Sequence, residues 1–382
     1  MEKHQVLNSH YIIDGIPQDL TPKEMLDRCL SVGECAGFSV ESQILDEIVD
    51  PVLQRNSFDS WKIKDYLDAV KNSPARSFPV AFSAQFTKIL IARALIDALW
   101  QEGNFRLGDL QVKAEWFWDT ARIGNMAAFY ASAQSAGEYI DNLSLKLSGY
   151  NFSECAGCGM RLSVTVSDED GEDENLGIEL PFRTAHPHFS ESRMIPGGFV
   201  DDPDSWLIYI PMDSCDFRLG GSTLSQVTRQ GCEVAPDLCD PDYFIDCFEV
   251  LREMAEDRVI IAAETIGDGG LLATLSKMAD ASGTRTGART GARISLTDII
   301  AAYGEQDIVR ILFSEVPGAI IQIRDVDYDY VDAELVLQDV IFFPLGHPVH
   351  GKPDIKVEAG GKTCIQSILE SLIRSQSSEG ED

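Results

Sequence analysis

The stretch 258–279, RVIIAAETIGDGGLLATLSKMA, most constrains the fold, because it combines a strand, a glycine turn and a helix in direct succession. Residues 259–263 are all apolar, as is typical of a strand covered on both faces. Apolar residues between Leu271 and Ala279 then recur at helical spacing. The turn between them consists of Gly267, Asp268, Gly269 and Gly270. This strand, turn and helix predict an α/β chain.

The glycine turn 267–270 has two interpretations. Glycines permit a tight backbone, and the helix that begins there offers free N–H groups to an anion or a polar ligand group. Alternatively, Asp268 is only the N-cap of the helix and the turn has no ligand. The residues of the turn leave both interpretations open.

A second glycine turn lies in the stretch 217–227, FRLGGSTLSQV, which follows an apolar strand at 206–212. Glycine N–H groups, a helix N-terminus, a hydroxyl and a guanidinium suit a phosphate or a carboxylate. The candidate anion-binding residues are Arg218, Gly220, Gly221 and Ser222. The alternative is tight packing of a helix against a strand.

Strands and helices alternate along the rest of the chain. Leu110 to Trp118 alternates between apolar and polar residues and predicts a strand. Amphipathic patterns predict helices at 83–100, 125–143 and 243–255, and further strands are predicted at 161–167 and 319–323. The chain is therefore expected to be α/β or α+β, with an internal boundary near 234–241.

Charge and composition exclude several functional classes. The formal net charge of −31 repels phosphodiester backbones and anionic membranes, so neither nucleic acid nor a membrane is an expected partner. The N-terminus lacks an apolar signal core, and no run approaches the roughly 18 apolar residues that cross a bilayer. We therefore expect a cytoplasmic protein.

The cysteines and histidines predict no metal site. Nine cysteines scattered along the chain are typical of reduced thiols rather than of a disulfide framework. Cys155 and Cys158 form a C-x-x-C pair, but no second pair has the spacing of a zinc ribbon. His186 and His188 could face the same side of an extended segment, yet they have no third ligand.

Four stretches of the chain, in the order in which the family has them, resemble the second half of the large phosphoribosylformylglycinamidine synthases. That half is built of aminoimidazole-ribonucleotide-synthetase-like domains. GDLQVKAEWFW resembles the family's strand that ends in Asn-Trp-Met-Trp, and FRLGGSTLSQV resembles its R-L-G-G-S-x-x-x-Q turn. AETIGDGGLLATLSKMA is similar to H-D-x-S-x-G-G-L-x-x-T-L-x-E-M, and ILFSEVPGAIIQI is similar to L-F-x-E-x-P-G-x-x-x-Q-V.

The resemblance implies two aminoimidazole-ribonucleotide-synthetase-like α/β domains after a helical N-terminal segment. They are expected at 81–235 and 236–357, between an N-terminal extension at 1–80 and a C-terminal segment with a polar tail at 358–382. The family enzyme uses ATP, magnesium and glutamine-derived ammonia to convert formylglycinamide ribonucleotide into its amidine in purine biosynthesis. No cysteine here lies in a glycine-flanked elbow that would activate it, so no glutaminase and no catalytic residue is expected.

The chain departs from the family's motifs where the family binds Mg·ATP. In place of the family's E-A-L-T-N helix it has R-A-L-I-D, and in place of His-Asp and G-K-D-S it has E-T and G-Y-N-F. Magnesium prefers several hard oxygen ligands, and these changes remove carboxylates. The degenerate nucleotide and magnesium positions are Arg93, Asp97, Tyr150, Asn151, Glu264 and Thr265. We therefore expect no cofactor, and Mg·ATP only if the site is retained.

These departures predict a nucleotide-free structural or regulatory relative of the synthase. The alternative is one subunit of a split synthase that supplies part of an active site to a partner chain, and a third option is a ligase for a different small molecule. The expected partner is a second copy or a hetero-partner with the missing half, and an anionic metabolite is a further candidate. Trp116 and Trp118 are the candidate partner face, unless they pack under the helix at 125–143.

Overall fold

The structure is a computed structural model that divides into two compact units. Unit 1 comprises Met1–Asp50, Pro74–Ala98 and Phe105–Pro187, and unit 2 comprises Pro51–Ser73, Leu99–Asn104 and His188–Asp382. The residues described are 3–30, 67, 78–101, 105–166, 174–180, 193–213, 217–228, 234–286, 289–305, 307–351 and 354–358. His186, His188 and the polar tail from residue 359 lie outside these residues.

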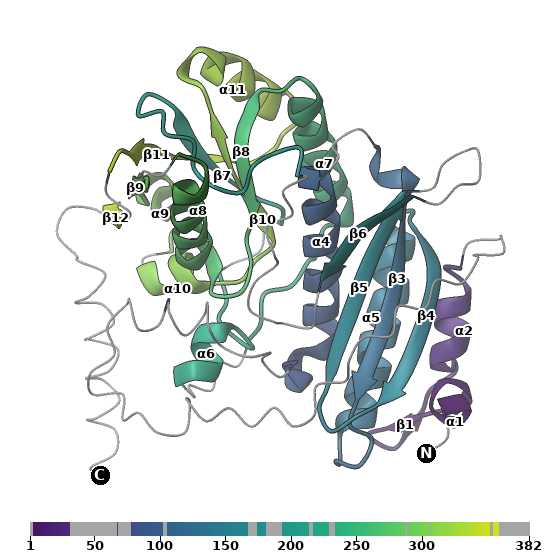
Figure 1. Cartoon of the computed structure of the whole chain (residues 1–382). Coiled ribbons are helices and arrows are strands. Elements are labelled where there is room, and N and C mark those ends of the chain that lie inside the picture. Colours follow the sequence, from purple (N-terminus) through teal and green to yellow (C-terminus); the bar gives the residue numbers. More distant parts are fainter. Residues whose placement is uncertain are drawn as a thin grey trace, which may run out of the picture. The chain divides into compact units, whose positions relative to one another are not determined.

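Unit 1 is built on a four-stranded sheet in the order β4-β3-β5-β6 (Figure 1). β3 runs parallel to β4 and antiparallel to β5, which pairs antiparallel with β6. The strands are β3 (Leu110–Trp118), β4 (Lys146–Glu154), β5 (Gly159–Val166) and β6 (Glu174–Leu180). The helices are α1 (Lys3–Asn8), α2 (Pro22–Asp27), α5 (Asn125–Asn142) and most of α4 (Ser83–Gln101), and short strands β1 (Ile12–Ile13) and β2 (Ile16–Pro17) follow α1.

Trp116 and Trp118 lie beneath α5, so the prediction that they form an uncovered partner face is wrong. Both side chains are fully buried. The indole N–H of Trp116 donates to Ser132 Oγ at 2.9 Å, and that of Trp118 donates to the Asn125 carbonyl at 2.7 Å. Both indoles make edge contacts with the Phe129 ring. Alternation along β3 points these large side chains to the face that α5 covers.

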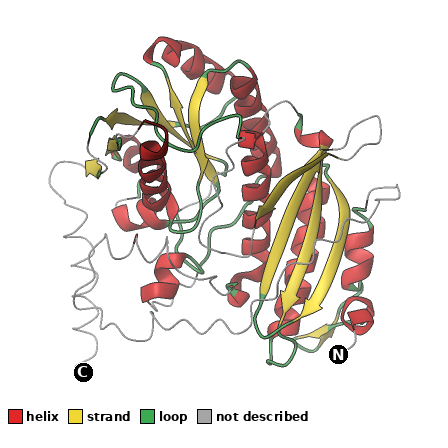
Figure 2. Ribbon diagram, in the orientation of Figure 1, coloured by secondary structure: helices red, strands yellow, loops and turns green. Residues whose placement is uncertain are grey.

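Unit 2 contains a six-stranded sheet in the order β12-β9-β11-β7-β10-β8, in which only β12 and β9 pair in parallel. Figure 2 distinguishes these strands from the helices around them. The strands are β7 (Trp206–Pro211), β8 (Ile260–Thr265), β9 (Gly291–Ser295), β10 (Gly318–Ile323), β11 (Phe343–Val349) and β12 (Ile355–Glu358). The helices are α6 (Thr223–Thr228), α7 (Pro241–Glu256), α8 (Gly270–Thr286), α9 (Thr297–Tyr303), α10 (Ile308–Phe313) and α11 (Tyr328–Leu337).

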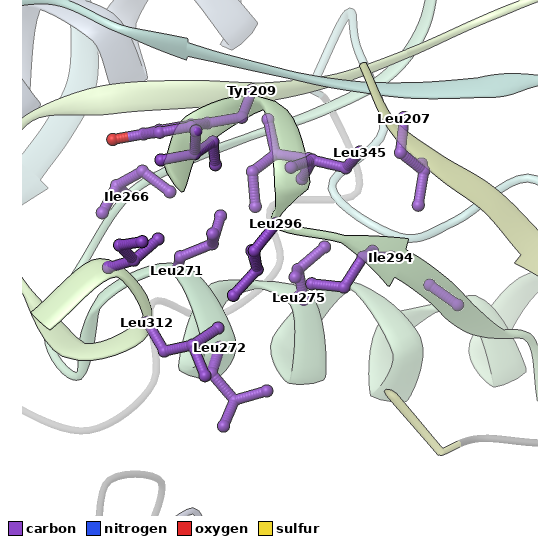
Figure 3. Close-up of a cluster of buried hydrophobic side chains, with 14 of the residues drawn as sticks. Leu207, Tyr209, Ile266, Leu271, Leu272, Leu275, Ile294, Leu296, Leu312 and Leu345 are labelled. Atoms are coloured by element: carbon purple, nitrogen blue, oxygen red, sulfur yellow. The ribbon is translucent and has the colours of Figure 1, made fainter. Parts of the chain in front are cut away.

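The core of unit 2 lies between the sheet and α8. Leu207 and Tyr209 of β7 pack there with Leu271 and Leu275 of α8, and Leu345 of β11 closes the same cluster (Figure 3). Every residue of β10 is buried, as expected for an inner strand covered on both faces. The strand, turn and helix predicted at 258–279 are thus confirmed as β8, the glycine turn and α8.

The division into units differs from the domain boundary expected at 235/236. β7 pairs with β10 and β11, so residues 206–211 belong to the sheet of unit 2. At the N-terminus, the hydroxyl of Tyr130 on α5 donates to the Leu20 carbonyl, and Leu30 bridges to Leu147 of β4, both within unit 1. No described helix is both long and apolar enough to span a bilayer.

Candidate functional site

The two glycine turns meet at the carboxylate of Glu315, and all three lie in unit 2. Glu315 Oε1 accepts hydrogen bonds from the backbone N–H of Thr223 at 2.7 Å and of Gly269 at 2.9 Å. Thr223 opens α6, and Gly269 immediately precedes α8. Glu315 is fully buried. The backbone N–H groups of Thr223 and Gly269 therefore donate to a side chain of the protein itself.

Other N–H groups of these turns also have protein acceptors. The acceptors are the Val234 carbonyl for Gly220 (2.8 Å), the Leu219 carbonyl for Ser222 (3.0 Å), Thr274 Oγ1 for Gly267 (3.3 Å) and the Gly267 carbonyl for Gly270 (3.1 Å). The Ser222 hydroxyl donates to the Leu219 carbonyl at 2.7 Å. An external anion would therefore have to displace these acceptors before it could bind the same N–H groups.

Close backbone approach explains two of the glycines. A Cβ on Gly220 would lie 2.4 Å from the Val234 carbonyl oxygen. A Cβ on Gly270, whose φ is +73°, would lie 2.7 Å from the Ser314 carbonyl oxygen. Real Cβ atoms do not approach backbone so closely, so larger residues would push these segments apart. The half-buried Arg218 belongs to the same packing, since its carbonyl accepts from the Ser314 hydroxyl at 2.7 Å.

Glu264, at the end of β8, is held by two cations. Lys277 Nζ on α8 lies 2.9 Å from Glu264 Oε1, and Arg193 Nη1 lies 3.1 Å from Oε2. Glu264 is buried. Burial alone would raise the pKa of its carboxyl group, but the two cations and their hydrogen bonds hold that pKa below its usual range. Glu264 is therefore ionised and fully paired at neutral pH.

The hydroxyl of Thr265, the residue after Glu264, accepts a hydrogen bond from a tryptophan. Thr265 Oγ1 accepts from the indole N–H of Trp100 at 2.9 Å, and both side chains are buried. A buried indole N–H needs an acceptor, so this hydroxyl satisfies a structural requirement of unit 2. A neutral hydroxyl in this contact has neither the charge nor the free lone pairs of a metal-binding carboxylate.

The other positions that the sequence predicts to form a degenerate nucleotide site lie in unit 1. The Tyr150 hydroxyl on β4 donates to Asp27 Oδ1 of α2 at 2.5 Å, and burial followed by the Asp27 carboxylate raises the pKa of Tyr150. Asn151 is exposed and accepts the N–H of Phe152 at 3.0 Å. On α4, Arg93 is buried and Asp97 is half-buried, one helical turn apart. The Tyr150 hydroxyl thus makes a hydrogen bond between β4 and α2.

Within the described residues, no group of three or more acidic, histidine or cysteine side chains could hold a metal ion. Cys155 and Cys158 have free thiols, and the Cys158 sulfur accepts from Asn125 Nδ2 at 3.4 Å. Burial raises the pKa of both thiols, which disfavours the nucleophilic and metal-binding thiolate. The C-x-x-C pair is therefore part of the packing of unit 1.

Several residues that make these contacts were not predicted from the sequence. A sequence pattern does point to Glu315, because this residue lies in the LFSEVPG stretch that resembles a family motif. Lys277 lies on the predicted helix, but nothing pointed it at Glu264. Arg193 and Trp100 are distant in sequence from the residues that they contact, and no local pattern identifies them.

Comparison with known proteins agrees with this architecture. No family model matches the chain. It is 25% identical over 280 residues to a probable phosphoribosylformylglycinamidine synthase, chloroplastic/mitochondrial, of Arabidopsis thaliana, covering 73% of this chain but 18% of the plant protein. The structure of Thermotoga maritima PurL complexed with FGAR superposes with a TM-score of 0.55 at 12% identity, covering 78% of this chain and 45% of PurL. PurL complexed with ATP gives 0.51 at 12% identity, covering 76% and 42%.

The sequence similarity is to a phosphoribosylformylglycinamidine synthase, and the similarity in fold is to PurL. The chain spans less than half the length of these relatives, and the identities to the solved structures establish the fold alone. The expected α/β class is confirmed. The chain is therefore similar to phosphoribosylformylglycinamidine synthase and has the aminoimidazole-ribonucleotide-synthetase-like fold of PurL.

Proposed function

We propose that this chain is a diverged relative of phosphoribosylformylglycinamidine synthase in purine biosynthesis that does not use Mg·ATP and has a structural or regulatory role. The contacts of Glu264 and Thr265 carry this proposal. These residues occupy the positions of the family's His-Asp pair, and their side chains are already used by Lys277, Arg193 and Trp100. Their local chemistry serves the fold of unit 2, because each Glu264 oxygen contacts a cation and the Thr265 hydroxyl accepts a hydrogen bond.

The residues at these positions do not fit magnesium. A divalent cation at Glu264 would have to displace Lys277 or Arg193 and would lie close to the other, so like charges would oppose its binding. Magnesium also requires near-octahedral oxygen coordination at short distances, and Thr265 supplies only a hydroxyl that is already hydrogen-bonded. The arginine at position 93 adds positive charge where the family's helix has a glutamate.

We expect the purified chain to bind Mg·ATP weakly or not at all in isothermal titration calorimetry. The double variant Arg93→Glu and Thr265→Asp restores the two family carboxylates and should recover measurable affinity. A matched control places the same changes at exposed positions, Arg106→Glu and Thr297→Asp, and should recover none. Circular dichroism verifies that each variant is folded. Micromolar binding by the unmodified chain would contradict the proposal.

A second expectation concerns the anionic metabolite predicted for the turn at 218–222. Because the buried Glu315 side chain already accepts the N–H groups of Thr223 and Gly269, we expect phosphate, sulfate and AMP to leave the melting temperature unchanged. A ligand at a hundred times its dissociation constant would stabilise the chain by about 2.7 kcal/mol, which thermal denaturation resolves. A rise that Arg218→Ala abolishes would instead establish the metabolite site and overturn the packing interpretation.

One observation favours the alternative of a split synthase. Both glycine turns, which resemble motifs of the family, come together at Glu315 in unit 2. A chain with that framework could supply walls of an active site whose catalytic residues lie on another chain. The test is reconstitution: amidine formation by a candidate partner that depends on adding this chain would favour the split enzyme over the structural role.

A further inference from the structure

The surface formed by residues 325–341, around α11, has an unusual concentration of exposed apolar side chains. Ten large apolar side chains are exposed among the described residues, and half of them lie here: Val326 (84%), Tyr330 (41%), Val336 (61%), Leu337 (75%) and Ile341 (37%). We call this surface the α11 face. Exposed apolar groups that gather in one place are typical of interaction sites, whereas isolated ones are ordinary.

The α11 face is held in place by its own contacts. Val331 and Leu335, one turn apart on α11, are fully buried and anchor the helix to unit 2. The Tyr330 hydroxyl donates to Asp257 Oδ2, at the end of α7, at 2.9 Å. Figure 1 shows α11 on the outside of the unit. Tyr330, Ala333 and Leu337 have the i, i+3, i+7 spacing of one helical stripe and are all exposed.

The segment that carries this stripe is acidic. Between residues 324 and 341 the only basic side chain is Arg324, which pairs with Asp327 at 3.5 Å. The acidic residues of the same segment are Asp325, Asp327, Asp329, Asp332, Glu334 and Asp339. A surface that combines exposed apolar side chains with carboxylates of one sign is complementary to an apolar surface bordered by lysine or arginine.

We propose that the α11 face binds a basic amphipathic helix of another protein. Apolar side chains of that helix would pack on Tyr330, Val336 and Leu337, while its basic residues would pair with the surrounding carboxylates. A second copy of this chain is the less favourable occupant, because a two-fold contact would place one acidic α11 face against another. The proposal does not depend on the function proposed above.

The test uses the full chain and a synthetic 18-residue peptide of leucine and lysine with leucines at helical i, i+3, i+4 spacing. A scrambled peptide of the same composition measures non-specific attraction to an acidic protein. Fluorescence anisotropy at 150 mM salt should give at least tenfold tighter binding of the amphipathic peptide than of the scrambled one. Equal binding of the two peptides would overturn the proposal.

Matched variants locate the binding surface. Val336→Ser with Leu337→Ser, both at exposed positions, should remove the tenfold preference, and Asp329→Asn with Asp332→Asn should weaken binding and its salt dependence. Ile123→Ser removes an even more exposed apolar side chain from unit 1 and should change nothing. The proposal would be overturned if the Val336 and Leu337 variant kept the preference for the amphipathic peptide over the scrambled one. It would also be overturned if the unmodified chain formed a dimer that this variant dissociates.

Discussion

Replacing Glu264 by glutamine should lower the free energy of unfolding of unit 2 by about 3 kcal/mol, because it leaves two cations beside a neutral amide. Breaking a buried ion pair costs about 3–5 kcal/mol, and the lower end applies here because the Lys277 side chain is 34% exposed. Glutamine has nearly the same shape as glutamate, so the loss reports the charge rather than a cavity. Urea denaturation together with hydrogen exchange of the β8 peptide measures the effect.

The pH dependence of this contribution has a definite sign. The pKa of Glu264 is lowered in the folded protein, so the unfolded chain takes up its proton at a higher pH than the folded chain does. The stabilisation is therefore fully present above the unfolded glutamate pKa of about 4.3 and is lost as pH falls through the lower folded value. The difference in stability between wild type and Glu264→Gln should shrink across that window.

A surface pair on α7 provides the control. Glu249 accepts from Arg252 Nε at 2.8 Å, but its side chain is 31% exposed and its partner has two further carboxylates nearby. Glu249→Gln should therefore cost less than about 1 kcal/mol. If Glu264→Gln costs no more than this control, the two cations do not hold Glu264, and its carboxylate would be available to a metal ion.

Local patterns were sufficient to predict several elements of the fold. Strict alternation along β3 predicted the strand, but it did not predict that α5 covers the face with the tryptophans. At the start of α2, Thr21 and Glu24 form the two reciprocal hydrogen bonds of a capping box, and Pro22 lies in the first turn, so this helix start also depends on neighbouring residues. The glycine turn before α8 followed from a strand-like run that changes to helical spacing. In each case the determining residues are close in sequence.

The candidate site could not be predicted in the same way, because its contacts join residues far apart in sequence. Trp100 reaches Thr265, and Glu315 reaches both Thr223 and Gly269. A glycine turn has the same sequence pattern whether its N–H groups bind a ligand or a distant carboxylate of the same chain. The boundary between the units differs from the expected domain boundary for a related reason. The strands that pair with β7, namely β10 and β11, lie more than a hundred residues further along the chain.

Replacing Trp116 by alanine should lower the free energy of unfolding of unit 1 by about 3–5 kcal/mol without changing the oligomeric state. The indole is fully buried under α5, so its removal leaves a cavity beside Phe129 and removes the hydrogen bond to Ser132. A side chain that only formed a partner interface would instead be dispensable for the folding of the isolated chain. Urea denaturation and light scattering measure the two properties separately.

Phe117, the next residue of β3, is the matched control. Its side chain points to the opposite face of the sheet, where it is half-buried and the Arg161 guanidinium lies 4.9 Å from the ring centroid. Phe117→Ala should cost less than Trp116→Ala, because a partly exposed ring leaves no closed cavity. A dimer of the wild-type chain that Trp116→Ala dissociates while stability is unchanged would show that α5 does not cover this strand. A large loss of stability confined to Trp116→Ala would place the β3 tryptophans in the core of unit 1, so any partner must bind another surface.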